Sequence, residues 1–312
     1  MASTIAIIGT GRVGTTTAYT LILQNLATHI ILLDADKKRC TGESIDLSDS
    51  LAFSRCTSVS CGCYQDLSKA DIIIIAAGQA QKDASQTRNE LARNNKKIIA
   101  SICAQFPPLQ KHCSIIIVTN PVDLMTRVAQ TQLPHHPRPQ IFGTGTWLDT
   151  QRLRRIISDK TSVAPESVQA FVIGEHGDHQ IVAWKHANIG GIPVKEWDIF
   201  PAEQEKIAEK TRTTVYEIIE KKQATFFGIA SCLGDICSAI IFDEKRILPL
   251  SWSPSPTIPP LSQPVILGRR GIQQQLTIPL EAIEQKRLHE SIKQLDSAWK
   301  DLVSETNGHS LI

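Results

Sequence analysis

The chain has 312 residues, of which 42% are hydrophobic and 21% are charged, and its formal net charge is +2. This length suits one large domain or two medium ones, with a hydrophobic core large enough to fold without disulfides or bound metals. The charges are nearly balanced and scattered along the chain, so nothing points to a nucleic-acid or membrane partner. With no signal peptide and no apolar run near about 20 residues, we expect a cytoplasmic protein.

The eight cysteines match neither the disulfide framework of a secreted domain nor a zinc site. Cys61 and Cys63 are separated by a single glycine, which is closer than the usual two-residue spacing of metal ligands. No second pair of cysteines or histidines completes such a site. We therefore expect reduced thiols and no bound metal.

The first 35 residues have the pattern of a dinucleotide-binding unit. An apolar strand over residues 5–8 leads directly into the glycine turn at 9–14. A helix is predicted over 12–26, and a second apolar strand over 29–33 ends in Asp34. This order of strand, glycine turn, helix, strand and acidic residue is much more specific than the glycine motif alone.

Each residue of the motif has a physical role in binding a dinucleotide. Gly9 allows the tight turn, Gly11 lets the backbone approach a pyrophosphate at the helix N-terminus, and Gly14 allows the helix to pack closely on the strand. Asp34 is placed to accept hydrogen bonds from the adenosine ribose hydroxyls, and its charge repels a 2′-phosphate. The pattern predicts NAD in preference to NADP, with FAD as the main rival because it uses the same motif.

Strands and helices continue to alternate up to residue 144. Buried strands are predicted over 71–78, 114–119 and 141–142, and a helix over 89–106. Continuous apolar strands are typical of a parallel sheet that helices cover on both faces. We expect an α/β fold in which residues 1–144 form a Rossmann domain with a doubly wound parallel sheet and bind ligand at the carboxyl ends of the strands.

The second half has a different pattern and predicts an α+β substrate domain over residues 145–312. Its expected elements are helices over 147–158, 202–222, 224–242 and 281–304, a strand over 168–173, and short strands between proline-rich turns over 247–278. The strand at 168–173 breaks at Gly174, and His176 follows between Glu175 and Gly177. An imidazole titrates near pH ~6.5 and can exchange a proton, although a lone histidine at a strand end is more often structural.

The chain resembles the lactate/malate dehydrogenase family, and its bacterial lactate branch in particular. The resemblance extends from the glycine turn to the C-terminal helix. It rests on specific stretches at residues 9–14, 119–123, 145–152, 174–178, 186–191 and 224–228. It implies hydride transfer between NADH and the carbonyl carbon of pyruvate, with a histidine supplying the proton to the oxygen.

The resemblance also implies a role for each site residue. His176 is the acid–base group, Asp149 is the carboxylate that orients it, and Arg152 clamps the substrate carboxylate through two parallel hydrogen bonds. Asn120 binds substrate or cofactor, and the bond to Pro121 is either cis or an ordinary trans turn. The residues expected to bind the cofactor are Gly9, Gly11, Val13, Gly14, Asp34, Arg39, Gly78, Val118, Asn120 and Thr144.

Substrate choice is expected to depend on residues 79–88, which in the family form a mobile lid carrying an arginine to the carbonyl. Arg88 is the candidate, although the segment lacks the family's glycine and its arginine comes one residue late, so the register stays open. Lactate enzymes place a glutamine early in the lid, here Gln81, and malate enzymes place an arginine. Pyruvate is therefore expected, with a malate or other 2-hydroxy-acid dehydrogenase as the alternative if Lys82 supplies the charge. Thr225 would lie against the substrate methyl group.

The resemblance gives expectations for regulation and assembly as well. Many bacterial lactate enzymes bind fructose 1,6-bisphosphate through an arginine, here Arg154 beside Arg155, and a histidine, here replaced by Gln169. A neutral amide cannot replace a cation opposite a phosphate, so weak or absent activation is expected. A homotetramer is implied, with interfaces on the helices after Asp36 and in the second domain. A non-catalytic relative kept for binding remains the rival of another class.

Overall fold

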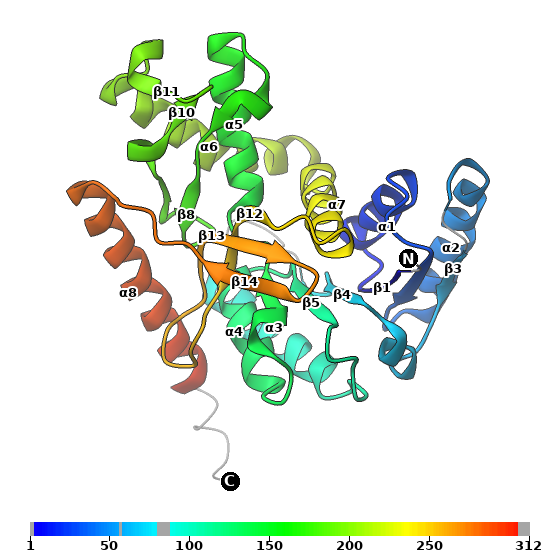
Figure 1. Ribbon diagram of the computed structural model, residues 1–312. Helices are drawn as coiled ribbons and strands as arrows, with labels where there is room; N and C mark the ends of the chain where they lie inside the picture. The colour runs from blue at the N-terminus through cyan, green and yellow to red at the C-terminus, as the bar shows by residue number, and fades with distance from the viewer. Residues whose placement is uncertain (1–2, 56–57, 80–87, 305–312) are drawn as a thin grey trace.

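The structure is a computed structural model and describes residues 3–55, 58–79 and 88–304. The N-terminal half contributes parallel strands in the order β3-β2-β1-β4-β5-β6 to one long sheet (Figure 1). These strands are β1 (Thr4–Ile8), β2 (His29–Leu33), β3 (Ser58–Cys61), β4 (Ile72–Ile75), β5 (Ser114–Ile117) and β6 (Ile141–Gly143). They are rich in isoleucine, which packs well in strands that are buried on both faces. The predicted Rossmann sheet is confirmed.

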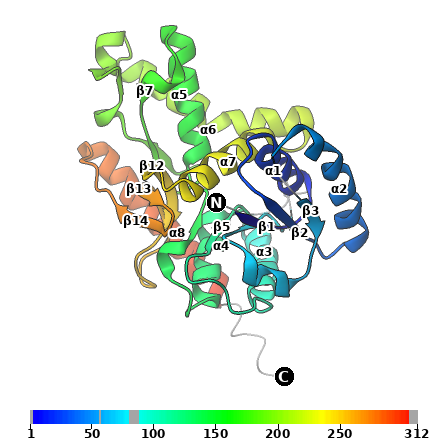
Figure 2. The same cartoon turned by 45° about the vertical axis from the view of Figure 1, so that its right-hand side comes forward.

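Helices cover both faces of this sheet because alternate strand residues point to opposite sides. Ile5 and Ile7 pack with α1 and α7 on one face, whereas Ala6 and Ile8 pack with α3 and α4 on the other (Figure 2). The helices concerned are α1 (Arg12–Leu23), α3 (Arg88–Cys103), α4 (Val122–Gln132) and α7 (Phe227–Ile241). Since α7 belongs to the C-terminal half, the two halves share a core.

The C-terminal half continues the same sheet with antiparallel strands. Ser251 of β12 pairs with Gly143 of β6, and the order continues through β13, β8 and β9, with β14 beside β13. A small separate sheet contains β11, β10 and β7 in that order. The strands of this half are β7 (Val168–Gln169), β8 (Val172–Gly174), β9 (Gln180–Val182), β10 (Asn188–Ile189), β11 (Ile192–Pro193), β12 (Arg246–Trp252), β13 (Leu261–Gly268) and β14 (Gly271–Gln275). The single strand predicted over 168–173 is wrong in detail, because its two ends pair in different sheets as β7 and β8.

The remaining helices are α2 (Lys37–Asp49), α5 (Trp147–Thr161), α6 (Pro201–Lys222) and α8 (Ala282–Ser304). Short 3₁₀ helices lie at Ser50–Phe53, Tyr64–Lys69, Arg138–Gln140, Pro165–Ser167, Trp184–His186 and Val194–Trp197. Helix α8 contacts α3 and α4, and so carries the end of the described chain back across the N-terminal half (Figure 1). None of the helices that the structure describes is both long and apolar enough to cross a membrane.

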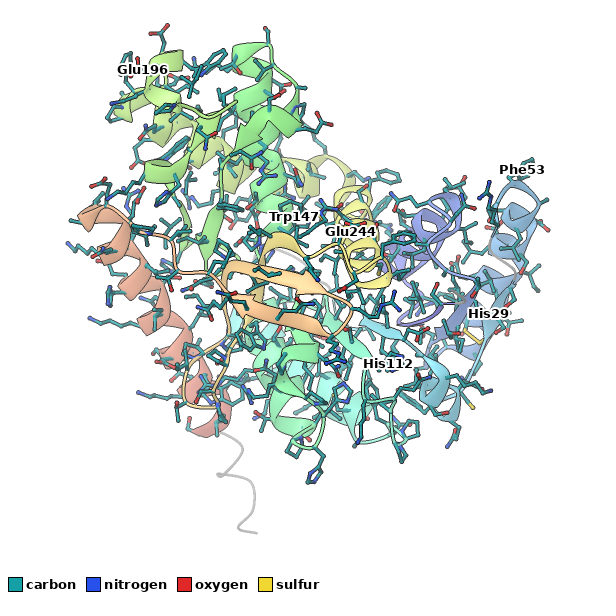
Figure 3. The ribbon with its side chains drawn as sticks, in the orientation of Figure 1. His29, Phe53, His112, Trp147, Glu196 and Glu244 are labelled. Atoms are coloured by element: carbon teal, nitrogen blue, oxygen red, sulfur yellow. A yellow bond between two sulfur atoms is a disulfide. The ribbon has the colours of Figure 1, made fainter. Side chains whose placement is uncertain are left out.

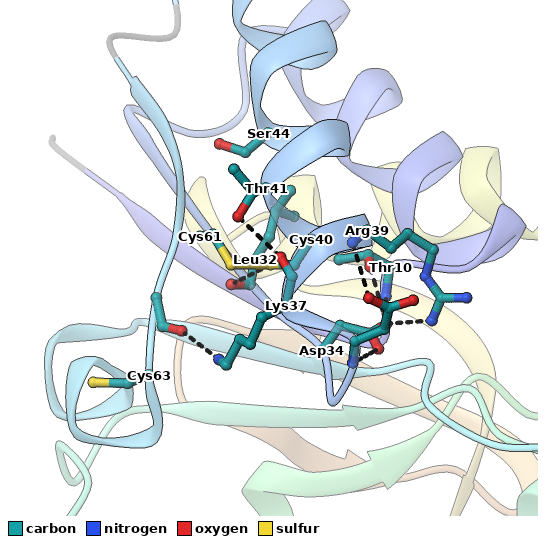
Figure 4. The surroundings of a disulfide bond; sticks show 12 residues. Thr10, Leu32, Asp34, Lys37, Arg39, Cys40, Thr41, Ser44, Cys61 and Cys63 are labelled. Carbon is teal, nitrogen blue, oxygen red and sulfur yellow. Dashed lines mark hydrogen bonds and ion pairs between the residues drawn. A yellow bond between two sulfur atoms is a disulfide. The ribbon is translucent and has the colours of Figure 1, made fainter.

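Cys40 of α2 and Cys61 of β3 form a disulfide (Figure 4). The expectation of reduced thiols is wrong for this pair. Cys40 lies on the buried side of α2, and its sulfur is 3.4 Å from the Leu32 carbonyl oxygen of β2. Because β2 and β3 are paired, Leu32 also lies opposite Cys61, and the two sulfurs meet across 21 residues of sequence. The described residues include no group of three potential ligands that could hold a metal ion.

Candidate active site

The glycine turn joins β1 to α1 at the carboxyl end of β1. Gly9 has a φ of +104°, and a Cβ on it would lie 2.5 Å from the Ala77 amide nitrogen, so the turn requires glycine. A Cβ on Gly14 would lie 1.9 Å from the Gly9 carbonyl oxygen, which shows how closely the helix packs on the turn. Gly11 is the N-cap of α1 and has open space around its Cα, so a phosphate can reach the helix N-terminus. Val13 lies half-buried in the first turn beside it.

Asp34 lies at the end of β2 and accepts hydrogen bonds from three neighbours (Figure 4). Thr10 donates its amide at 2.7 Å and its hydroxyl at 2.9 Å to one oxygen, and the Asp36 amide donates to the other at 2.9 Å. The Arg39 guanidinium is 2.9 Å from the first oxygen. Burial opposes ionisation, but these donors outweigh it and hold the pKa of Asp34 below its usual value. A stable carboxylate with Arg39 beside it therefore stands where adenosine ribose is expected.

The other predicted cofactor residues follow neighbouring strands. Gly78 comes after β4, Val118 and Asn120 after β5, and Thr144 after β6. Because these strands are adjacent and parallel to β1, the residues lie along the same edge of the sheet as the glycine turn. The Asn120–Pro121 bond is cis, which decides between the two alternatives left open by the sequence.

Asn95 of α3 is a site residue that the sequence reasoning missed. It is fully buried, and its Oδ1 accepts the Gln79 amide at 2.7 Å. Its Nδ2 donates to the Asn120 carbonyl at 2.7 Å and to the Gln79 carbonyl at 3.2 Å. One amide thus holds the chain after β4 against the chain after β5. The available signal was an amide at a position where the helix over 89–106 should bury an apolar side chain.

Asp149, Arg152 and His176 form one buried cluster, as the resemblance predicts. Asp149 and Arg152 are one turn apart on α5, and the Arg152 Nη1 lies 2.9 Å from Asp149 Oδ1. The His176 Nδ1 lies 2.7 Å from Asp149 Oδ2, so the two oxygens of one carboxylate hold two different side chains. Only 4% of the Asp149 side chain is exposed, against 26% for His176. The described residues offer no hydrogen-bond partner for His176 Nε2, which leaves that nitrogen available to a substrate.

The electrostatics of the cluster favour an ion pair. Burial by itself raises the pKa of Asp149, but His176 and Arg152 outweigh it, and the pKa lies below the usual value. Burial lowers the pKa of His176, but Asp149 and then Asp123 outweigh it, and the pKa lies above the usual value. The arrangement favours the protonated imidazole, which can release its proton to an acceptor at Nε2.

Three predicted substrate residues are not brought into this cluster by any described contact. Gln81 lies outside the described residues, and Arg88 is the first residue of α3. Thr225 lies half-buried in the turn between α6 and α7. The roles given to them by resemblance stay predictions.

The two residues expected at an effector site both lie in the C-terminal half, Arg154 on α5 and Gln169 in β7. The guanidinium of Arg154 stacks between Trp147 and Phe171, 5.3 and 5.6 Å from their ring centres, and its Nε donates to the Ala170 carbonyl at 3.2 Å. Burial lowers the pKa of Arg154 to about 10. Gln169 is exposed, and its amide donates to the Glu166 carbonyl.

His176 lies close to the edge of the sheet that holds the glycine turn. Its backbone N–H donates to Asp123 at 2.8 Å, and Asp123 comes three residues after Asn120 at the end of β5. A cradle for a dinucleotide and a proton-carrying imidazole therefore share one face of the molecule. Together they define an oxidoreductase that uses a nicotinamide cofactor.

Comparison with known proteins agrees with this class. Residues 3–143 match the NAD-binding domain of lactate/malate dehydrogenase, and residues 146–306 match its α/β C-terminal domain. The chain belongs to the lactate/malate dehydrogenase family. It is 36% identical to L-lactate dehydrogenase A of Rhizopus oryzae, over 95% of this chain and 92% of that one. It is also 36% identical to the L-lactate dehydrogenase of Latilactobacillus sakei subsp. sakei (strain 23K), over 96% and 94% of the two chains.

Solved structures give the same result for the fold. A lactate dehydrogenase from a Medee basin deep-sea metagenome library superposes with a TM-score of 0.89 at 32% identity, covering 96% of this chain and 99% of that one. The minor L-lactate dehydrogenase of Enterococcus mundtii gives a TM-score of 0.88 at 30% identity, with coverages of 96% and 98%. The similarity thus includes both halves of the chain.

Proposed function

We propose that this protein is an NAD-dependent L-lactate dehydrogenase that interconverts pyruvate and L-lactate. The observation that carries the proposal is the single carboxylate of Asp149, which holds both His176 and Arg152. One of these side chains suits proton transfer to a carbonyl oxygen, and the other suits binding of a carboxylate. A 2-keto acid carries these two groups on adjacent carbons.

The cofactor site fits NAD in its chemistry. The open backbone at Gly11 would receive the pyrophosphate, and the Asp34 carboxylate would accept from the ribose hydroxyls. Gly78, Val118, Asn120 and Thr144 would line the path along the strand ends towards His176. Bound NADH would supply the hydride.

The residues of the chain perform the rest of the reaction. Arg152 orients pyruvate through its carboxylate, and Asn120 binds beside it. As negative charge grows on the carbonyl oxygen, His176 donates its Nε2 proton, while Asp149 fixes the Nδ1 tautomer. In lactate oxidation the neutral imidazole accepts the proton through the same nitrogen. Arg88 is proposed to polarise the carbonyl, and Thr225 to contact the methyl group.

Pyruvate is the proposed substrate because Gln81 is neutral. Placing the second carboxylate of oxaloacetate beside an amide would cost several kcal/mol. The relatives named above are lactate dehydrogenases, and the malate alternative is not favoured. A comparison of kcat/KM for pyruvate and oxaloacetate with NADH tests this point, and a preference for oxaloacetate would contradict it.

Replacement of His176 tests the mechanism. His176→Asn is expected to abolish pyruvate reduction while NADH still binds, as measured by quenching of NADH fluorescence. His179→Asn is the matched control, because His179 is exposed three residues further along the same loop. Undiminished turnover by the His176 variant would overturn the assignment, and NADH binding without turnover of any keto acid by the unaltered protein would favour a non-catalytic relative.

We also propose a homotetramer that works in the cytoplasm, with domains over residues 1–144 and 145–312. Apolar side chains stand exposed on α1, α2 and α7, including Leu23, Ile45 and Phe227, and Phe53 is 86% exposed at the outer edge of the molecule (Figure 3). A cavity of about 640 Å³ opens between α5, α7 and the segment that follows α1, and it is partly lined by Trp147. These surfaces suit contact with a second copy. Light scattering of the purified protein tests the stoichiometry, and a monomer at assay concentration would contradict it.

Fructose 1,6-bisphosphate is proposed to activate weakly or not at all. The Arg154 guanidinium is turned inward onto two rings, and Gln169 carries no charge. Titration of fructose 1,6-bisphosphate into the pyruvate assay should leave the half-saturating pyruvate concentration unchanged. A large fall in the half-saturating pyruvate concentration would contradict this proposal and show that a phosphate site exists.

A further inference from the structure

The loop over residues 174–178 is held from three directions. Asp149 of α5 binds the imidazole of His176, as described above. Asp123 of α4 accepts the backbone N–H of the same residue at 2.8 Å, and Ser291 of α8 accepts the Glu175 N–H at 2.9 Å. The reactive ring is thus fixed through its side chain by the C-terminal half, and through its backbone partly by the N-terminal half.

Asp123 is a carboxylate in an unusual position. Only 2% of the residue is exposed, and it lies in the first turn of α4, where the helix N-terminus favours a negative charge. Its Oδ1 accepts the Ser251 hydroxyl at 2.5 Å, while Oδ2 accepts the His176 amide. Burial raises the pKa of Asp123 above its usual value, and the Ser251 and His176 donors offset only part of that rise. Both oxygens are hydrogen-bonded, as a buried carboxylate requires.

The charges around the imidazole explain what a second carboxylate contributes. Asp149 and Asp123 favour the protonated ring, and Arg152 disfavours it. Asp149 alone faces two cations, because its oxygens are divided between His176 and Arg152. With Asp123 included, an imidazolium and a guanidinium face two carboxylates. Glu175, the neighbouring acid in the loop, has one side-chain oxygen buried.

We propose that Asp123 is a positioning residue for His176, which fixes the catalytic loop across the boundary between the two halves and supplies the second negative charge behind the imidazolium. The proposal rests on the proposed role of His176 as the proton donor. Asp123 is hydrogen-bonded to the backbone of His176 and not to its ring, so it acts through that residue. Its removal should therefore change the pH dependence of the reaction, which a purely structural residue would leave alone.

Asp123→Asn is the main test. The amide keeps an oxygen that can accept the His176 N–H, and its NH2 group can donate to the Ser251 oxygen, so the change removes the charge and reverses one hydrogen bond. We expect the alkaline limb of the kcat/KM profile for pyruvate to move to lower pH, so that above the limb the variant falls about tenfold below the unaltered enzyme. On the acid side of the limb, where His176 is protonated in both proteins, the two rates should converge to within a few-fold.

Two further variants make the test specific. Ser291→Ala removes the other anchor of the loop and leaves all charges in place, so it should not move the alkaline limb. Ser251→Ala removes one donor to Asp123 and should move the limb in the same direction as Asp123→Asn, by less. Thermal melting and NADH binding would show whether Asp123→Asn folds. If it does not fold, the shift of the alkaline limb in Ser251→Ala tests the inference in its place.

The outcomes separate this inference from the proposed function. If Asp123→Asn folds and keeps the limb of the unaltered enzyme, Asp123 does not act on the imidazole and the inference is wrong, while the role of His176 stands. If Ser291→Ala shifts the limb as far as Asp123→Asn does, the effect arises from loop mobility and the charge argument fails. If His176→Asn retains full activity, the proposed function fails and the inference fails with it.

Discussion

Asp149→Asn is the most informative single substitution in this enzyme. The change removes the charge that holds both His176 and Arg152, and it keeps the size of the side chain. The His176 Nδ1 and Asp149 Oδ2 atoms are 2.7 Å apart. Two unit charges about 4 Å apart interact by about 4 kcal/mol at an effective dielectric constant of 20. If most of this energy is needed to keep the ring protonated and oriented in the transition state, kcat/KM should fall about a thousandfold.

The direction of the pH dependence follows from the raised pKa of His176. The ion pair stabilises the folded protein fully below the pKa of an unfolded histidine, and this contribution is lost as pH rises through the folded pKa. In Asp149→Asn both the contribution and its pH dependence should largely disappear. Arg152, with only 11% of its side chain exposed, also loses its buried partner, so the free energy of unfolding should fall by about 3 kcal/mol or more.

The fall in kcat/KM is measured by following pyruvate reduction by NADH by absorbance from acid to alkaline pH. The fall in the free energy of unfolding is measured by urea denaturation at two pH values. NADH affinity should not change, since the adenosine site around Asp34 lies on another part of the sheet edge. Asp159→Asn is the control, because Asp159 is an exposed acid on the same helix. More than a tenth of the normal kcat/KM in Asp149→Asn, with an unshifted pH profile, would refute the electrostatic argument.

Other changes probe separate parts of the molecule. Arg152→Lys keeps the charge but loses the paired donors, so KM for pyruvate should rise about a hundredfold while NADH affinity holds; an unchanged KM would exclude the clamp. Asp34→Ser removes the carboxylate that repels a 2′-phosphate, so the ratio of NADP to NAD efficiency should increase about tenfold or more, and a constant ratio would contradict its assigned role. Reducing the Cys40–Cys61 disulfide, or replacing Cys61 with serine, should lower the free energy of unfolding by about 3 kcal/mol in urea titrations. The reason is that the bond no longer closes a loop in the unfolded chain between two residues 21 apart in sequence. Cys63→Ser, an exposed free thiol, should not have this effect.

The sheet of the N-terminal half could be predicted because its signals are local. Runs such as the four isoleucines of β4 fit a strand covered on both faces, and the glycine turn fixes the path from β1 into α1. The residues that follow these strands then lie at one edge by topology alone. The placement of Gly9 and Asp34 at this edge could therefore be predicted from the local pattern, whereas the role of Asn120 was predicted only through the family resemblance.

Contacts between distant segments were not accessible in the same way. The Cys40–Cys61 bond depends on how α2 lies against β3, and no spacing rule encodes that. Asn95 joins two loops from the interior of a helix, where its burial depends on packing. The sequence also gave no reason to divide residues 168–173 between two sheets, because the division depends on which strands become their neighbours.

Asp123 joins the two halves of the chain through hydrogen bonds. It lies in the first turn of α4, the helix that follows β5, and it accepts hydrogen bonds from Ser251 of β12 and from the backbone of His176. Ser251 in turn pairs with Gly143, so the sheet is continuous beside the carboxylate of Asp123. A rotation of one half against the other would break these hydrogen bonds together and would leave a buried carboxylate without its donors, which is costly. The position of the imidazole relative to the glycine turn and the ends of the parallel strands is therefore set by the folded framework itself.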